Sequence, residues 1–198
     1  VTLKALKRRG ITREAIYELA NNVGLSKHPV NLQFDMIAAI NRKIVDSTSG
    51  RYSFVDNPVE LTLPGDWNIR NVSVPIHPSK PEKTREIQVN KIFVSQKDLD
   101  ELKGQEVRLL HLCNVILDPK KLKVTSIENK KIPKIQWVSD FVNAKILMPD
   151  GSWREGAAEI GVVDLKKGAL VQFERVGFAR LDNISKDKKS VEFWFAHQ

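Results

Sequence analysis

Residues 46–55 read DSTSGRYSFV, and the hydrophobic pattern of the chain changes across them. Before this stretch, apolar residues recur at the three- and four-residue spacing of amphipathic helices. After it, they fall in short runs that Pro and Gly turns separate, as in antiparallel strands. Its first residues are small and polar, which is typical of a linker. We therefore expect a small helical piece over residues 1–50 and an all-β part over residues 51–198.

The helical piece is expected to contain three short helices. The first should end at residues 7–10, where three cations precede a glycine stop. Thr12 is the expected N-cap of the second helix, and Gly24 its end. Asn31 is the expected N-cap of the third, whose isoleucines recur at helical spacing.

The β part is expected to hold ten strands and one short helix from its N-cap Ser95 to Leu102. The expected strands are Tyr52–Val55, Val59–Leu63, Glu86–Val94, Glu106–Leu117, Leu122–Ile127, Lys134–Val138, Phe141–Leu147, Ala169–Arg175, Gly177–Leu181 and Ser190–Phe195. Short strands at this spacing indicate an antiparallel barrel or sandwich. The predicted fold class is therefore mainly β, preceded by helices.

The composition limits the classes of function. The 198 residues are 41% hydrophobic and 28% charged, as in soluble globular proteins. No apolar run approaches the roughly 20 residues of a membrane span, so we expect no membrane role. The single cysteine, Cys113, excludes a disulfide framework and fits a reducing compartment. The chain starts at Val1 without a signal peptide, and we expect it to be a fragment of a longer protein.

The net charge indicates a polyanionic partner. Lys and Arg number 32 against 24 Asp and Glu, a balance of +8 that favours nucleic acid over acidic lipid. Four arginines stand beside apolar or aromatic residues instead of in lysine runs: Arg51, Arg108, Arg175 and Arg180. Their planar donors suit base edges and phosphates. The alternative is that each pairs with a nearby carboxylate such as Glu174 or Asp182. Trp137 lies between apolar residues and is expected in the core.

Catalysis by this chain is not expected. It contains no nucleophile elbow, no P-loop and no dinucleotide-binding glycine motif. His111 and Cys113 would share one face of a strand, which is the only pairing that resembles metal ligands. A zinc site needs three or four ligands, and no second pair is present. We therefore expect no catalytic residue and no metal site.

Six segments in order along nearly the whole chain carry a family resemblance: 3–16, 51–59, 77–82, 104–109, 135–138 and 173–182. Together they resemble the region after the catalytic domain of glutaminyl- and glutamyl-tRNA synthetases of the archaeal and eukaryotic type. The resemblance implies two antiparallel β-barrels, proximal and distal, that exchange strands and clamp the anticodon loop. The distal barrel would come mostly from the middle of residues 51–198, and residues 1–50 would join the barrels to the catalytic domain.

The resemblance also implies roles for single residues. Arg51 matches the loop arginine that contacts the middle anticodon base, and Gln172 and Arg175 match residues that close on the same part of the loop. Arg108 matches the first of two strand arginines at the wobble base. The second position is Leu110 here, so the sequence departs from the family's pattern at that contact.

Two further positions bear on the choice of tRNA. Bacterial glutaminyl enzymes place a Lys-Arg pair against the third anticodon base, where this chain has Leu99 and Asp100. The loss of donors aimed at guanine favours glutamate tRNA, with glutamine tRNA as the alternative partner. Lys7, Arg8 and Arg9 would contact only the tRNA backbone.

The sequence thus predicts the anticodon-binding part of a cytoplasmic, monomeric glutamate enzyme of this family. The family's ATP-binding signatures are absent, so ATP and Mg would belong to the catalytic domain outside this chain. The alternatives are the same region of a glutaminyl enzyme, a free-standing β-barrel RNA-binding protein, or a metal-dependent β-barrel enzyme.

Overall fold

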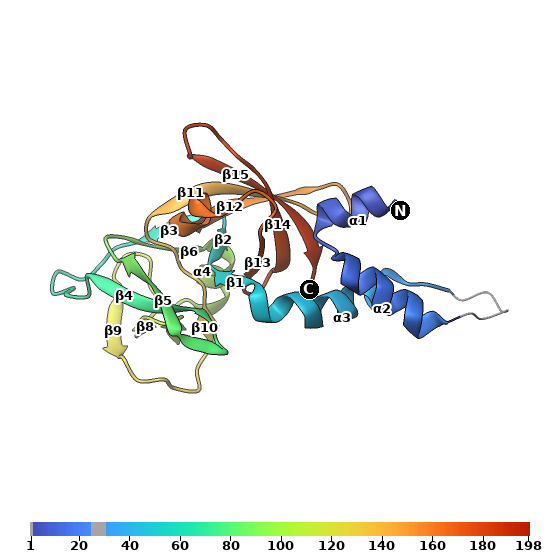
Figure 1. Ribbon diagram of the computed structural model, residues 1–198. Helices are drawn as coiled ribbons and strands as arrows, with labels where there is room; N and C mark the ends of the chain where they lie inside the picture. Colours follow the sequence, from blue (N-terminus) through green and yellow to red (C-terminus); the bar gives the residue numbers. More distant parts are fainter. Residues whose placement is uncertain (1, 25–30) are drawn as a thin grey trace.

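The computed structural model describes residues 2–24 and 31–198. Helices α1 (Leu3–Arg9), α2 (Arg13–Val23) and α3 (Phe34–Val45) and the 3-10 turn η1 (Asp46–Thr48) come first. Figure 1 shows these helices at one end of the molecule, with the strands beyond them and the C-terminus beside α3. None of the helices in the described ranges has both the length and the apolar character that a membrane crossing requires.

Local signals set the ends of the first two helices. Thr12 Oγ1 accepts a hydrogen bond from the backbone N–H of Ala15 at 3.1 Å, which confirms the expected cap. Gly10 ends α1 with a φ of 93°, a left-handed conformation that favours glycine. The expected cap at Asn31 is wrong, because α3 begins at Phe34 after Gln33, whose side chain makes no capping bond.

One mixed sheet of seven strands forms the larger β unit. Its spatial order is β1 (Gly50–Tyr52), β13 (Leu170–Phe173), β14 (Gly177–Ile184), β15 (Ser190–His197), β11 (Phe141–Leu147), β12 (Trp153–Glu159) and β2 (Phe54–Asp56). The outer strands β1 and β2 follow one another in the chain with only Ser53 between them. The two edges therefore come together, and the sheet nearly closes into a barrel.

The middle of the chain forms a second β unit. It contains a four-stranded sheet in the order β10 (Lys134–Ile135), β7 (Glu106–Leu109), β8 (Asn114–Ile116) and β9 (Lys123–Ser126). Two-stranded ladders pair β3 (Pro58–Leu61) with β6 (Ile92–Ser95), and β4 (Asn71–His77) with β5 (Lys80–Gln88). Helix α4 (Gln96–Leu102) follows β6, and the 3-10 turn η2 (Ile160–Asp164) follows β12.

Each β unit has a hydrophobic core of its own. Phe173 and Phe193 are fully buried in the first core, and their rings meet edge to face with centroids 4.9 Å apart. Leu109, Ile135 and Trp137 lie in the second. Trp137 is 4% exposed, which confirms the expectation that it is a core residue.

The mainly β class and the leading helices are confirmed, whereas the closed second barrel and the boundary at residue 50 stay predictions. Three strand pairs are parallel: β1 with β13, β7 with β10, and β11 with β15. The other strand pairs are antiparallel, so the expected antiparallel pairing does not hold at these three positions. Hydrophobic alternation reports which face of a strand is buried and carries no information on the direction of its neighbour.

Several strand boundaries also differ from the expectation. The predicted strand Glu106–Leu117 is a hairpin, β7 and β8, and the predicted strand Glu86–Val94 is split between β5 and β6. Strands β4 and β12 were not predicted, because Pro75 and Gly156 interrupt their patterns. In β12 the glycine is required, since a Cβ on Gly156 would collide with the backbone of β2.

Candidate nucleic-acid interface

The sheet brings Arg51 and Gln172 side by side. Strands β1 and β13 are parallel neighbours, and their register pairs Arg51 directly with Gln172. Paired positions of adjacent strands present their side chains on the same face. Two predicted site residues that are far apart in the sequence are therefore adjacent in the structure.

Arg51 is held only loosely by its carboxylate neighbours. Its guanidinium lies 3.6 Å from Asp46 Oδ1 and 3.8 Å from Glu174 Oε1, beyond hydrogen-bond length. Arg51 therefore forms the expected ion pair with Glu174 only at long range. Its Nε–H is buried and has no acceptor among the described residues.

Glu174 connects Arg51 to a residue that the sequence prediction did not include. That residue is Gln136, which is 5% exposed. Its Nε2 donates to Glu174 Oε2 at 2.7 Å. The contact fixes the orientation of the amide, because the flipped form would set the amide oxygen against a carboxylate. Gln136 Oε1 then has no donor among the residues that the structure describes.

Arg175 is turned toward helix α4. Its Nη1 and Nη2 donate to the two carboxylate oxygens of Asp98, both at 2.9 Å. The side chain of Asp98 is 4% exposed, while that of Arg175 is 49% exposed. Arg175 has a φ of 66°, a left-handed conformation that costs a non-glycine residue free energy and often marks functional sites.

The unsatisfied polar atoms of the described residues lie in one neighbourhood. The buried side-chain atoms without a hydrogen-bond partner there are Ser49 Oγ, Arg51 Nε, His77 Nε2, Gln136 Oε1 and Gln172 Oε1. Asp46 lies near both Arg51 and His77, with its Oδ2 3.9 Å from His77 Nε2. We name these five residues, together with Asp46 and Glu174, the Arg51 cluster. Buried unpaired groups are uncommon in proteins, so their concentration in one cluster indicates a ligand site.

Two small cavities adjoin the Arg51 cluster on either side of Glu174. The first has a volume of about 70 Å³ and is lined by Arg51, Tyr52, Arg85 and Leu110, among others. The second, of about 130 Å³, lies beside Gln136 and Arg175. Glu174 lines both cavities. Of the Arg51 cluster, Arg51 and Glu174 line the first cavity, and Gln136 and Glu174 line the second.

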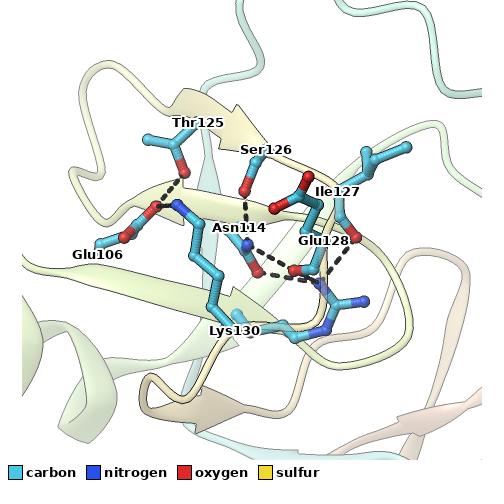
Figure 2. A network of polar contacts seen from close by, with 8 residues as sticks. Glu106, Asn114, Thr125, Ser126, Ile127, Glu128 and Lys130 are labelled. Atoms are coloured by element: carbon cyan, nitrogen blue, oxygen red, sulfur yellow. Dashed lines mark hydrogen bonds and ion pairs between the residues drawn. The ribbon is translucent and has the colours of Figure 1, made fainter.

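Arg108 lies outside this cluster and donates to the polar network of Asn114, Ser126 and Glu128 that Figure 2 shows. Its Nη1 donates to Asn114 Oδ1 at 2.9 Å, to the carbonyl of Glu128 at 2.9 Å and to that of Ile127 at 3.2 Å. Asn114 Nδ2 donates in turn to Ser126 Oγ at 2.7 Å. Arg108 Nη1 therefore holds the segment after β9 in place. Only the other guanidinium nitrogens of Arg108, Nε and Nη2, are available to a ligand.

The predicted backbone contacts Lys7, Arg8 and Arg9 lie on α1, away from the Arg51 cluster. Arg8 Nη2 pairs with Asp182 Oδ2 at 3.1 Å, and this hydrogen bond lowers the pKa of Asp182. Arg9 donates to the carbonyls of Phe195 at 3.2 Å and Ala196 at 2.9 Å, and burial lowers its pKa. Arg8 and Arg9 therefore also hold α1 against β14 and β15.

His111 and Cys113 do not share a strand face, so that interpretation was wrong. His111 has a φ of 63° in the turn between β7 and β8, where burial lowers its pKa. Cys113 is fully buried in the second core, and burial raises its pKa to about 11. In the described ranges, no three His, Cys, Asp or Glu side chains gather where a metal ion could be held.

Gln136 and Asp98 belong to the site in the structure but are not among the residues that the sequence predicts for it. Gln136 stands in one of the six resembling segments, and Asp98 lies within the expected short helix Ser95–Leu102. Nothing in the hydrophobic pattern distinguishes either from a surface residue. Their roles follow from contacts across the sequence, with Glu174 and with Arg175.

Comparison with known proteins finds two family models and a group of relatives that match the sequence. The sequence model of the family "tRNA synthetases class I (E and Q), anti-codon binding domain" matches residues 49–138, and a second model of the same description matches residues 128–182. Glutamate–tRNA ligases of Pyrococcus abyssi and Methanobrevibacter smithii are 40% and 37% identical over 94% and 100% of this chain. That of Sulfurisphaera tokodaii is 39% identical over 97%. The chain spans 35–36% of the length of these relatives.

Proposed function

Because the chain belongs to the family of anticodon-binding domains of class I (E and Q) tRNA synthetases, we propose that it binds the anticodon loop of glutamate tRNA. In this proposal it is part of a monomeric, cytoplasmic glutamate–tRNA ligase. In this proposal ATP and Mg²⁺ belong to a catalytic domain outside this chain, and no residue here is assigned to them. The chain alone has no ligase activity.

The unpaired polar atoms of the Arg51 cluster carry the proposal. A buried donor or acceptor without a partner costs about 1 to 3 kcal/mol, and the described chain concentrates five of them here. A ligand rich in both donors and acceptors would recover this free energy. An unstacked nucleobase is such a ligand, and single-stranded loops are the part of RNA that proteins recognise by base edges.

The chemistry of Arg51 and Gln172 suits the middle base. By the genetic code this base is uracil in every glutamate anticodon, and its edge presents an acceptor, a donor and an acceptor. The guanidinium of Arg51 supplies donors, and the unpaired Oε1 of Gln172 is an acceptor for the uracil N3–H. We assign the middle base to this pair, with Arg175 closing on the same part of the loop.

The remaining site residues have weaker roles in the proposal. Arg108 contacts the wobble base through the guanidinium nitrogens that the β9 segment does not use. Leu110 lines the smaller cavity and offers no side-chain donor. Lys7, Arg8 and Arg9 contact phosphates, so their loss would weaken binding to all tRNAs and reduce its salt dependence.

Equilibrium binding of this chain to transcribed tRNA tests the proposal. We compare glutamate tRNA with the same transcript carrying adenine as the middle base, at two salt concentrations. We expect a preference for the native anticodon that persists at the higher salt, because base contacts depend less on counterion release than phosphate contacts do. Equal binding of both transcripts that disappears with salt would leave only a basic surface on a polyanion.

A second comparison separates the glutamate from the glutamine assignment. The names of the relatives support glutamate, and the two tRNAs differ at the third anticodon base. Binding to glutamate tRNA should exceed binding to glutamine tRNA. The reverse order would assign the chain to a glutaminyl enzyme and leave the anticodon-binding role in place.

A further inference from the structure

The hairpin of β4 and β5 reaches from the second β unit to the segment in front of Arg51. Lys80 Nζ donates to the carbonyl of Ser47 in η1 at 2.8 Å. His77, at the end of β4, is 6% exposed and lies beside Asp46, the first residue of η1. The hairpin therefore holds the segment that carries Asp46.

A hydrogen bond fixes the place of the ring proton of His77. Its Nδ1 accepts from the backbone N–H of Ser79 at 3.1 Å. Since a backbone N–H can only donate, Nδ1 is the acceptor and the ring N–H is on Nε2. This Nε2 is buried without a hydrogen-bond partner among the described residues, and Asp46 Oδ2 lies 3.9 Å from it. The N–H of His77 can therefore attract the carboxylate of Asp46.

The guanidinium of Arg51 lies between two carboxylates from different segments. Its Nη2 is 3.6 Å from Asp46 Oδ1, and its Nη1 is 3.8 Å from Glu174 Oε1. Each of these nitrogens carries two N–H groups, so one on each remains for a ligand when both carboxylates are engaged. Attraction at both terminal nitrogens limits the rotation of the planar group and keeps the remaining donors in one orientation.

Each carboxylate has a buried donor beside it. Gln136 Nε2 donates to Glu174, and the Nε2–H of His77 faces Asp46. Resting on the proposed function, we infer that Asp46 is a positioning residue for Arg51 and that His77 acts through Asp46. Neither residue touches the base. Together they hold the guanidinium ready for the middle base, so that less conformational freedom is lost on binding.

Charge and positioning predict opposite effects for the loss of Asp46. The chain has a net charge of +8 and RNA is a polyanion, so removal of a carboxylate should by charge alone strengthen binding to any RNA. Positioning predicts weaker base recognition, because Arg51 would turn toward Glu174, the carboxylate that remains. The ratio of affinities for two RNAs that differ only in the middle base separates the effects, since the charge contribution is the same for both.

Anticodon stem-loops with uracil or adenine at the middle position test the inference by equilibrium binding. Asp46→Ala should reduce the preference for uracil about tenfold and leave the affinity for the adenine loop unchanged or higher. Asp46 is 41% exposed, so this variant should fold, which urea unfolding checks. Asp35→Ala, at an exposed aspartate of α3, removes the same charge and should keep the full preference. An unchanged or larger preference in Asp46→Ala would overturn the inference.

His77→Phe tests whether His77 acts through Asp46. It removes the N–H that faces Asp46 without changing the charge of a neutral ring, and should reduce the preference for uracil about threefold. In the Asp46→Ala background it should have no further effect, because the carboxylate that it supports is gone. A further loss there would overturn the role of His77. If His77→Phe does not fold, the Asp46→Ala comparison still decides the role of Asp46.

The wild-type chain separates this inference from the proposed function. If wild type does not distinguish the uracil loop from the adenine loop, the proposed function fails and the inference fails with it. If wild type prefers uracil and Asp46→Ala retains that preference in full, only the inference fails.

Discussion

Arg51 and Arg85 line the same small cavity, yet their surroundings differ. Arg85 donates to both oxygens of Glu159, with Nη2–Oε2 at 2.8 Å, and also to the carbonyl of Pro75 at 3.3 Å. Its guanidinium lies 4.6 Å from the ring centre of Tyr52. Arg51 has only ion pairs of 3.6 and 3.8 Å and an unpaired Nε.

The difference separates an arginine that holds the fold from one available to a ligand. A guanidinium with its donors engaged gains nothing from a new partner, and its removal leaves a buried carboxylate alone. A guanidinium with unpaired donors contributes little to stability and can bind a base edge without first breaking strong contacts. Four predictions test this distinction, from the largest expected effect to the smallest.

Arg85→Met should cause the largest loss of stability. It leaves the carboxylate of Glu159, whose side chain is 5% exposed, without its cation, and should lower the free energy of unfolding by about 3 to 5 kcal/mol. Urea denaturation measures the change. The control is Lys91→Met, which removes an exposed ion pair with Glu60 and should cost less than about 1 kcal/mol. Similar losses for both variants would contradict the distinction.

The contrast between the two arginines also shows how far the sequence alone could lead. The order of helices and strands follows from local periodicity, and Thr12 and Gly10 acted as their types predict. Arg51 stands beside the aromatic Tyr52 and Arg85 between Thr84 and Glu86, but this local difference does not show which of the two guanidinium groups is paired with a carboxylate. What differs is the contact with a carboxylate from a distant part of the sequence. Arg85 donates to both oxygens of Glu159, whereas Glu174 Oε1 lies 3.8 Å from the guanidinium of Arg51. The resemblance singled out Arg51 and Gln172, whereas Gln136 became visible only through its unpaired oxygen.

Asn41→Leu tests whether a buried side chain whose polar atoms are all hydrogen-bonded stabilises the fold even when, unlike Arg85, it carries no charge. Buried Asn41 accepts from the N–H of Thr12 at 2.8 Å, donates to the carbonyl of Gly10 at 3.1 Å and contacts His197 Nε2 at 2.9 Å. Its replacement should cost about 2 to 3 kcal/mol of unfolding free energy, because two backbone groups lose their partner.

Thermal and urea unfolding measure this cost. Asn22→Leu, at an exposed asparagine of α2, is the matched control and should change stability by less than about 0.5 kcal/mol. Anticodon preference should not change in either variant, since Asn41 lies at the junction of the helices with β15 and outside the Arg51 cluster. A change in preference with unchanged stability would show that the junction takes part in recognition.

Arg51→Ala should act on binding and leave stability almost unchanged. We expect affinity for glutamate tRNA to fall by about 2 kcal/mol, near thirtyfold, with a shift in unfolding free energy below about 0.5 kcal/mol. Arg13→Ala removes the same charge from the exposed surface of α2 and serves as the control. If Arg51→Ala unfolds the chain as Arg85→Met does, Arg51 belongs to the structural arginines and its assigned role is wrong.

The smallest effect concerns the pH dependence of the helix–sheet junction. Since the Oδ1 of Asn41 accepts from Thr12, its Nδ2 must donate to His197 Nε2, so the ring is neutral and its Nδ1–H donates to the carbonyl of Gln198 at 3.1 Å. Burial lowers the pKa of His197, and the nearby cations Arg42 and Arg9 lower it further. The folded state therefore resists a proton that the unfolded state accepts.

The sign of the effect follows from that difference. Above the unfolded-state pKa of about 6.5, the His197 ring is neutral in both states, and protonation of this ring does not lower the free energy of unfolding. As the pH falls from about 6.5 toward the lowered folded pKa, the unfolded state binds the proton first, and stability declines by up to about 1.4 kcal/mol per pH unit. Urea titrations between pH 7 and pH 5 should show this decline in the wild type and a smaller one in His197→Gln, whose amide oxygen can still accept from Asn41. If the unfolding free energy of the two proteins changed equally with pH, His197 would bind its proton in the folded state as readily as in the unfolded state. The contact between Asn41 and His197 would then accept a charged ring.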